Sequence, residues 1–222
     1  MNLKDYKREL NLIAKQNMTE YDLYSLVMAL LREGENIKAL SLRDVSRRIK
    51  SARGQVFYGL SSIPDLVILD ENFDNEHNAN KNIDNINQIY GCIEVKALNK
   101  PLPTIHTINE KLQSSLSPEE GQLLGTILWY RKVIYTNGLD WIYYECEYSD
   151  DYWKEIKKNV ERRIAGKANI HWYKEIDLTK VSIKSNSLMN GTNRSVKQLT
   201  IDDINEINWQ EFRENLHQIN WK

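Results

Sequence analysis

The chain has 222 residues, of which 41% are hydrophobic and 27% are charged, and its net charge is −1. This composition is typical of a folded globular protein with one sizeable core, and it excludes a disordered chain as well as a surface that binds polyanions everywhere. The longest nearly apolar run, at 23–31, is too short to span a bilayer, and the charged first residues do not form a secretory signal. We therefore expect a cytoplasmic protein without a membrane partner.

The first helix is predicted over residues 19–33. Leucine and valine side chains recur at helical spacing in this segment, which indicates a helix with one apolar face. Thr19 followed by Asp22 forms a variant capping box that starts the helix at Glu20. Glu20 lies one turn before Leu23 on the core-facing side, so its carboxylate need not point into solvent.

A basic stretch follows this helix. Ser41 and Asp44 predict a second short helix here, and the basic residues are Arg43, Arg47, Arg48, Lys50 and Arg53. Contacts from such side chains to phosphate groups would supply affinity without sequence information. A solvated helix face explains the same charges equally well, but their position directly before the next strand favours contact with nucleic acid.

Two short β-branched runs place acidic residues among apolar ones, at 63–70 and at 90–98. Because alternate side chains of a strand share a face, the apolar residues of the second run can point into a core while Glu94 and Lys96 project together from the opposite face. Asp65 opens the first run, which can pair beside the second.

These three side chains form a candidate metal site. Two carboxylates and one ammonium are poor packing groups, but carboxylate oxygens are preferred ligands of hard divalent ions. The alternative interpretation is a hairpin whose second strand has a solvated polar face, on which Glu94 and Lys96 form an exposed pair of little energetic value.

The segment between the two runs, at 71–88, is dense in Asn and Asp, and we interpret it as a mobile hairpin tip that is a neutral insertion rather than a groove-binding element.

A helix is predicted to begin after Ser117 and to run to about Arg131, because Ser-Pro-Glu-Glu is a strong helix start. Gly121 and Gly125 on this helix are expected to permit close packing.

Two further β-rich runs surround Asn137-Gly138, a dipeptide that favours a tight type I′ hairpin turn. The remainder of the chain is predicted to contain a charged helix at 150–165, a strand pair at 170–184, a polar loop at 185–195 and a final helix near 202–217.

The Pro64-Asp65 pair and the Glu94-Val95-Lys96 triplet, in the order helix, strand, strand, helix, strand, resemble the core of the PD-(D/E)XK nuclease superfamily. The segment VIYTNGLDW also looks like the strand and turn after the catalytic site in nuclease domains of type I restriction motor subunits and related phage or bacterial proteins.

The resemblance covers about residues 19–145. It implies an α/β (α+β) fold in which a restriction-endonuclease-like core of mixed β-sheet is flanked by helices. No repeat and no linker is apparent, so we expect one nuclease-like domain over 1–222 with a C-terminal elaboration at about 150–222.

The resemblance also assigns roles to named residues. Asp65 and Glu94 would ligate Mg²⁺ or Mn²⁺, with the carbonyl group of Val95 as a further ligand. An acid of the first helix often joins the metal site in this superfamily, and Glu20 matches that position. Glu33, at the far end of the same helix, is the competing candidate.

Lys96 would orient the attacking water and stabilise charge that builds up on the phosphate. Gln122 matches a glutamine that contacts the site or the substrate in this superfamily. The tyrosine that usually follows four residues later is absent, since position 126 is Thr.

The predicted function is a magnesium-dependent endonuclease that cleaves nucleic acid, DNA rather than RNA, in phage–host defence, counter-defence or DNA processing. Two alternatives stay open: the same fold acting as a nucleic-acid- or protein-binding module with dispensable catalysis, and an α/β adaptor with an accidental motif. The sequence leaves a homodimer open as well.

Overall fold

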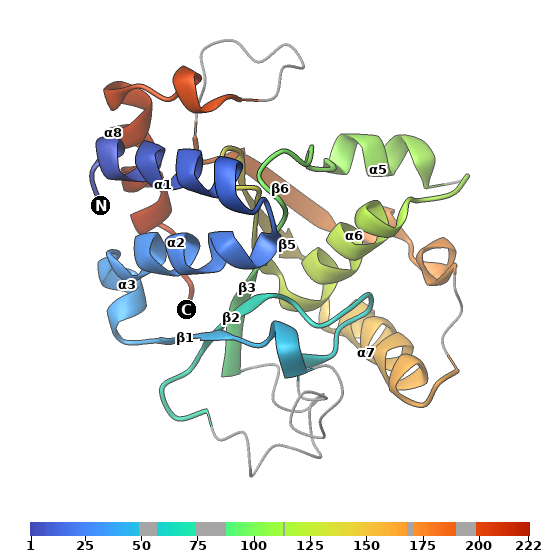
Figure 1. Cartoon of the computed structure of the whole chain (residues 1–222). Coiled ribbons are helices and arrows are strands. Elements are labelled where there is room, and N and C mark those ends of the chain that lie inside the picture. Colours follow the sequence, from blue (N-terminus) through green and yellow to red (C-terminus); the bar gives the residue numbers. More distant parts are fainter. Residues whose placement is uncertain (49–56, 74–87, 113, 168–170, 190–198) are drawn as a thin grey trace.

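The computed structural model describes residues 1–48, 57–73, 88–112, 114–167, 171–189 and 199–222. Its centre is a mixed sheet of six strands in the order β1-β2-β3-β4-β5-β6 (Figure 1). The strands are β1 Ser41–Asp44, β2 Leu66–Leu69, β3 Ile89–Val95, β4 Lys132–Thr136, β5 Trp141–Glu147 and β6 Ser182–Ser187. Strands β3 and β4 pair in parallel, and the other neighbouring pairs are antiparallel.

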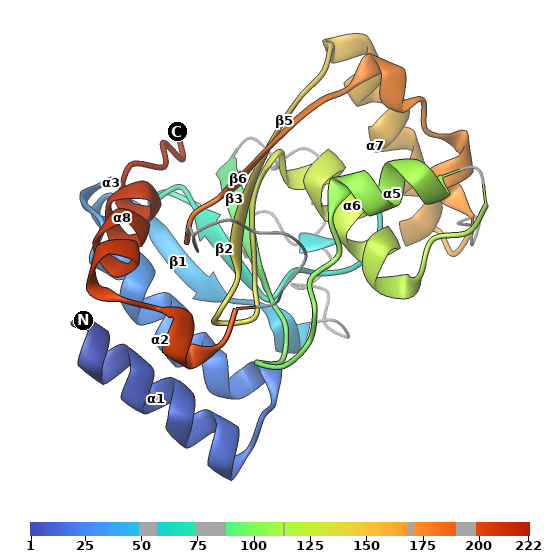
Figure 2. The same ribbon diagram turned by 90° about the horizontal axis from the view of Figure 1, so that it is seen from above.

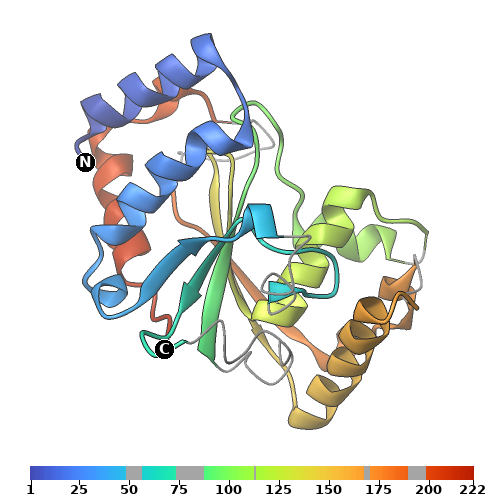
Figure 3. The same ribbon diagram turned by 60° about the horizontal axis from the view of Figure 1, so that its bottom comes forward.

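Helices cover both faces of the sheet (Figures 2 and 3). The helices on one side are α1 Leu3–Gln16, α2 Glu20–Arg32, α3 Glu35–Lys38 and α8 Glu206–His217, and those on the other are α5 Ile105–Lys111, α6 Pro118–Tyr130 and α7 Asp150–Ile164. Short 3₁₀ turns are η1 Ser46–Arg48, η4 Trp172–Glu175, η5 Leu178–Lys180 and η6 Ile201–Asp203. Within the described residues, no helix has the length and apolar character needed to cross a bilayer.

The sheet divides the apolar interior into two cores, one on each face. Ile93 and Val95 of β3 belong to the core shared with α1, α2 and α8, whereas Cys92 belongs to the core shared with α6 and α7. Alternation along the strand therefore directs Glu94 toward α6. This confirms the predicted facing of β3.

The parallel pairing of β3 with β4 brings α6 to the candidate site. Parallel neighbours require a crossover connection, and here the crossover contains α5 and α6. The backbone N–H of Lys96 donates to the carbonyl oxygen of Thr136 at 2.7 Å, which continues the pairing beyond the last residue of β3. Predicted helices at 19–33 and from Ser117 to about Arg131 are confirmed as α2 and α6.

The predicted helix at residue 41 is wrong, because Ser41–Asp44 forms strand β1. This segment pairs antiparallel with Leu66–Leu69, and Leu42 is buried against the first core. The Ser-x-x-Asp pattern was read as a helix cap, but the Asp44 carboxylate instead accepts hydrogen bonds from the backbone and hydroxyl group of Ser46. Pairing with a buried neighbouring strand outweighs the weak local signal.

The hairpin around Asn137-Gly138 is confirmed, but its turn is not of type I′. Gly138 has a φ of 84°, whereas Asn137 has no positive φ, which a type I′ turn would require. The buried side-chain oxygen of Asn137 accepts from the backbone N–H groups of Leu139 and Asp140, at 2.9 and 2.7 Å. These side-chain bonds stabilise a longer loop between β4 and β5.

The predicted charged helix near 150–165 is confirmed as α7, and the final helix as α8. The strand pair at 170–184 is wrong: two 3₁₀ turns precede one strand, β6, which pairs with β5 instead of with a neighbour in its own segment. The expected hairpin tip at 71–88 lies largely outside the described residues. The predicted polar loop at 185–195 is wrong at its start, because residues 185–187 belong to β6, and its part from 190 onward lies outside the described residues.

The N-terminal helix α1 was not predicted from the sequence, and it packs against the C-terminal helix α8. The ring of Tyr6 of α1 packs at a tilt against Trp209 of α8, with 4.5 Å between the ring centroids, and its buried hydroxyl donates to the carbonyl oxygen of Gly138. The last third of the chain thus supplies part of the core that supports α2 and β3.

Candidate active site

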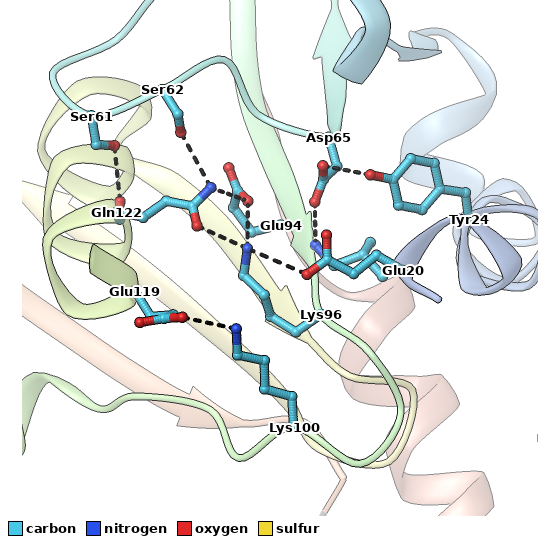
Figure 4. Close-up of polar contacts among 11 residues, drawn as sticks. Glu20, Tyr24, Ser61, Ser62, Asp65, Glu94, Lys96, Lys100, Glu119 and Gln122 are labelled. Atoms are coloured by element: carbon cyan, nitrogen blue, oxygen red, sulfur yellow. Dashed lines mark hydrogen bonds and ion pairs between the residues drawn. The ribbon is translucent and has the colours of Figure 1, made fainter. Parts of the chain in front are cut away.

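Asp65 lies directly before β2 and is partly buried between α2 and β3. Its Oδ1 accepts a 2.5 Å hydrogen bond from the hydroxyl group of Tyr24, and its Oδ2 accepts one of 2.8 Å from the backbone N–H of Val95 (Figure 4). Burial raises the pKa of Asp65 above its ordinary value, against the opposing effect of these two hydrogen bonds. The carboxylate is therefore fixed in position by groups from two elements.

Glu94 of β3 is fully buried, although it is an acidic residue. Its Oε2 accepts a 3.0 Å hydrogen bond from Nε2 of Gln122, whereas its Oε1 has no hydrogen-bond partner among the described residues. Burial raises the pKa of Glu94 well above its ordinary value, and repulsion by Asp65 adds to the shift. A buried oxygen without a donor is costly, which marks a place for a ligand or an ion.

Lys96 follows β3 directly and extends along the same face. Its Nζ donates to Oε1 of Gln122 at 2.8 Å and lies 3.5 Å from Oε2 of Glu94, while its side chain is only 7% exposed. The interpretation of Glu94 and Lys96 as an exposed surface pair is therefore wrong. Helix α6 covers this face, so the two charges interact where water screens them weakly.

Gln122 of α6 bridges the lysine and the glutamate. Its amide oxygen accepts from Lys96, and its amide nitrogen donates to Glu94 and, at 3.2 Å, to the hydroxyl oxygen of Ser62. The hydroxyl group of Ser61 donates to the backbone carbonyl of Gln122 at 3.1 Å. Sequence reasoning had missed both serines because they lie far from α6 along the chain.

Glu20 lies at the rim of the site, with Oε1 4.0 Å from Nζ of Lys96 and a side chain that is 38% exposed. The competing acid, Glu33, lies at the opposite end of α2 and pairs with Arg213 at 2.9 Å. Of the two acids, the structure brings Glu20 to the site.

Tyr24 was also missed, although a signal for it exists. It lies one helical turn after Glu20, so the two side chains emerge from the same face of α2. The nearby pair of Lys100 and Glu119, 2.8 Å apart, borders the site without contacting Asp65 (Figure 4).

The basic stretch is only partly described. Arg43 and Arg47 are exposed, and the Arg47 guanidinium lies 5.4 Å from the ring of Tyr21, a 55% exposed residue next to Glu20. Arg48 lies in η1, while Lys50 and Arg53 are outside the described residues. Of these arginines, Arg47 is thus placed beside the rim of the candidate site.

Among the described residues, the candidate site offers two carboxylates to a divalent ion, those of Asp65 and Glu94, but not a third. Within the part of the chain that the structure describes, no three His, Cys, Asp or Glu side chains are grouped to hold a metal, so Glu20 does not complete a three-carboxylate site in this conformation. Mg²⁺, however, is commonly bound through one or two carboxylates and several waters. Asp65 and Glu94, with its unpartnered Oε1, provide such a donor set.

Chemically, the cluster combines two carboxylates whose proton affinity is raised, one ammonium and one bridging amide. Such a set can hold a cation and place a positive side chain beside it. No family model, curated protein or solved structure matched the chain in our comparisons.

Proposed function

We propose that the protein is a metal-dependent nuclease of PD-(D/E)XK type that hydrolyses phosphodiester bonds, with DNA as the favoured substrate. The observation that carries this proposal is the convergence of Asp65, which directly precedes β2, with Glu94 and Lys96 at the end of the paired strand β3, in the order that the superfamily motif requires. We further propose a restriction-endonuclease-like core within one domain. Cytoplasmic defence, counter-defence or DNA processing would suit this activity.

Asp65 and Glu94 would hold Mg²⁺ or Mn²⁺, and the carbonyl group of Val95 and the carboxylate of Glu20 are the further ligands proposed. When bound, the metal supplies Lewis acidity toward the phosphate and lowers the pKa of coordinated water. The two hydrogen bonds to Asp65 fix its oxygens before any ion binds. Preorganisation of this kind reduces the reorganisation that catalysis would otherwise require.

Lys96 would orient the attacking water and stabilise the negative charge that develops on the phosphate oxygens. The amide of Gln122 keeps the Lys96 ammonium close to Glu94, because one amide binds both side chains. Arg43 and Arg47 are exposed, Arg47 beside the rim of the site, and both would contact backbone phosphates.

A binding module without required catalysis is the second candidate. The observation that favours it is the burial of Glu94 and Lys96, which are 0% and 6% exposed. In this view the cluster holds α6 against β3, and the exposed arginines bind nucleic acid.

A cleavage assay on supercoiled plasmid and labelled oligonucleotides separates the two candidates. With Mg²⁺ or Mn²⁺ we expect cleavage, whereas with Ca²⁺ we expect binding without turnover, because Ca²⁺ adopts longer and looser coordination. Lys96→Ala should lower kcat by about 10²–10³-fold, as the loss of a group that stabilises developing charge does. Lys100→Ala removes a neighbouring lysine and serves as the matched control.

Binding of DNA by a folded wild-type protein that cleaves no substrate with any of these ions would favour the binding module. Cleavage that is unchanged in EDTA, or a Lys96→Ala variant with the wild-type kcat, would exclude the metal mechanism.

A further inference from the structure

A second candidate site lies at the opposite end of α6 from Gln122. A cavity of about 450 Å³ opens between the start of β3, the end of α6 and the start of α7. Its volume is in the range of small-molecule pockets. Arg131, which follows the last residue of α6, is separated from Gln122 by on the order of 13 Å along the helix axis. The residues that line the cavity include Tyr90, Trp129, Arg131, Asp150, Trp153 and Trp221.

Aromatic surfaces make up much of the cavity wall. Trp129 and Trp153 stack with 4.9 Å between their ring centroids and 28° between their planes. Trp153 is half-buried, so part of its indole is accessible to a ligand. Trp129 is 1% exposed, and its indole N–H has no hydrogen-bond partner among the described residues. Buried indole N–H groups usually have a partner, and an acceptor bound beside Trp129 would supply the one that is missing here.

Arg131 places a positive charge at the same cavity. Its guanidinium carbon lies 4.4 Å from the centroid of the Tyr148 ring and 5.4 Å from that of Trp153, while the residue as a whole is exposed. Its φ is 65°, and it is the one residue other than glycine with a positive φ in the described part of the chain. Glycine normally occupies such a position after a helix, and strained residues of this kind are concentrated at ligand clamps.

The neighbouring cation is already engaged. Nζ of Lys132 donates to the carbonyl oxygens of Asn220 and Lys222, at 2.7 and 3.0 Å. The Arg131 guanidinium also forms a hydrogen bond with the Tyr148 side chain, which leaves further donors of its five N–H groups for an anion, and its ring contacts orient it in advance. A guanidinium recognises phosphate through paired N–H donors, and indole rings bind planar bases by stacking.

We propose that this cavity binds a nucleotide, with the base against the half-buried indole of Trp153 and the phosphate at Arg131. The ligand is a free nucleoside monophosphate or an unpaired nucleotide of a strand, since both present the same chemistry. Asp150 adds an acceptor that suits the exocyclic amino group of adenine or cytosine. This inference goes beyond the proposed nuclease and does not depend on its activity.

The test uses the full-length protein and the fluorescence of its tryptophans. AMP and a short single-stranded oligoadenylate are titrated separately, with adenosine and inorganic phosphate as partial ligands, and calorimetry gives the dissociation constants. We expect saturable quenching by at least one of the two nucleotides. Adenosine and phosphate should each bind at least about tenfold more weakly, because each lacks one of the two contacts.

Two variants examine the two contacts. Trp153→Ala should weaken nucleotide binding by about tenfold or more, through loss of the stacking surface. Arg131→Gly should weaken it by a similar factor with little change in the melting temperature, because the relief of strain at a positive φ offsets the lost contacts with the Tyr148 and Trp153 rings. The melting temperature thus separates a binding role for Arg131 from a structural one. Lys96→Ala is the control for binding at the candidate active site and should keep the wild-type affinity.

Binding of AMP alone would identify a free nucleotide as the ligand, and binding of the oligonucleotide alone would identify a strand. The proposal is overturned if neither probe quenches the fluorescence saturably, if Arg131→Gly and Trp153→Ala both bind as the wild type does, or if Lys96→Ala removes the binding.

Discussion

The hydroxyl group of Tyr24 on α2 donates a 2.5 Å hydrogen bond to Oδ1 of Asp65, which joins the first predicted helix to the first half of the strand motif. Burial and the nearby Asp65 charge raise the pKa of Tyr24 far above its usual value, so the phenol keeps its proton throughout the physiological range. Tyr24 therefore acts as a permanent donor that orients the carboxylate. Hydrogen-bond partners of this kind fix the orientation of a metal-ligating side chain although they do not coordinate the metal themselves.

Tyr24→Phe should weaken Mn²⁺ binding by about 10-fold to 100-fold, the range typical for loss of a hydrogen bond to a ligating side chain. The physical reason is that Asp65 would lose one of its two orienting donors and keep only the N–H of Val95. Calorimetric titration of the metal-free protein with Mn²⁺ measures this change directly.

Tyr21→Phe is the matched control, because Tyr21 is an exposed tyrosine of the same helix and makes no hydrogen bond to Asp65 in the structure. Equal Mn²⁺ affinities for the two variants would contradict the orienting role of Tyr24.

The metal-free protein should become less stable as the pH rises above the ordinary carboxyl range. Burial raises the folded-state pKa of both Glu94 and Asp65, so the folded protein retains protons that the unfolded chain releases. Stability is then greatest below the unfolded-state pKa and falls until the pH passes the folded-state pKa. The charged groups that act on these carboxyls are Lys96, which lowers their pKa, and Glu20, which raises it. One retained proton corresponds to a slope of about 1.4 kcal/mol per pH unit.

Urea unfolding between about pH 4 and pH 8 measures this slope for the wild type and for Glu94→Gln. The glutamine variant should have a shallower slope, since one of the two titrating groups is gone. Saturating Mg²⁺ should also reduce the slope, because the ion stabilises the ionised carboxylates. A slope that is identical in all three samples would show that these carboxyls are not the cause.

Replacing both Arg43 and Arg47 by alanine should weaken DNA binding and make it less dependent on salt. Each lost phosphate contact reduces the slope of log K against log [salt] by ~0.9 for duplex DNA. Fluorescence anisotropy at several salt concentrations measures the slope. Lys4→Ala with Arg8→Ala, two exposed cations of α1, is the control of equal charge. If both double variants show the same slope, Arg43 and Arg47 make no specific contribution.

Gly125→Ala and Gly121→Ala should change the stability of α6 in opposite directions. A Cβ at Gly125 would lie 2.7 Å from Cβ of Ser61, whereas a Cβ at Gly121 would meet nothing within 4 Å. The expectation of close packing thus holds for Gly125 and fails for Gly121. We expect Gly125→Ala to cost about 1–3 kcal/mol through overpacking, and Gly121→Ala to stabilise the helix by about 0.5–1 kcal/mol.

Thermal unfolding of the two variants provides the comparison. Gly125→Ala should also lower any nuclease activity, because it would displace Ser61 from the backbone of Gln122. Two variants with the same melting temperature would mean that Ser61 moves away at no cost.

Local signals in the sequence were sufficient for several elements that build the site. The capping residues Thr19 and Ser117 mark the starts of α2 and α6, because a cap satisfies backbone groups only a few residues away. Alternation in β3 correctly separated Ile93 and Val95 from Glu94, since neighbouring side chains of a strand must face opposite sides.

Contacts between distant segments decided the rest. The strand at Ser41–Asp44 exists because β2 is available as a partner, and the segment by itself carries only a weak helix signal. Glu94 and Lys96 are buried because the crossover between the parallel strands β3 and β4 places α6 over their face of the sheet. Tyr24 and Ser62 are remote from them in sequence and join the cluster only in the folded chain. Alternation and capping act locally, so the sequence was sufficient to place Glu94 and Lys96 on one face of β3 and to mark the start of α6. Whether these two charges face water or each other depends on chain segments that are remote in sequence, so it follows only from the folded structure.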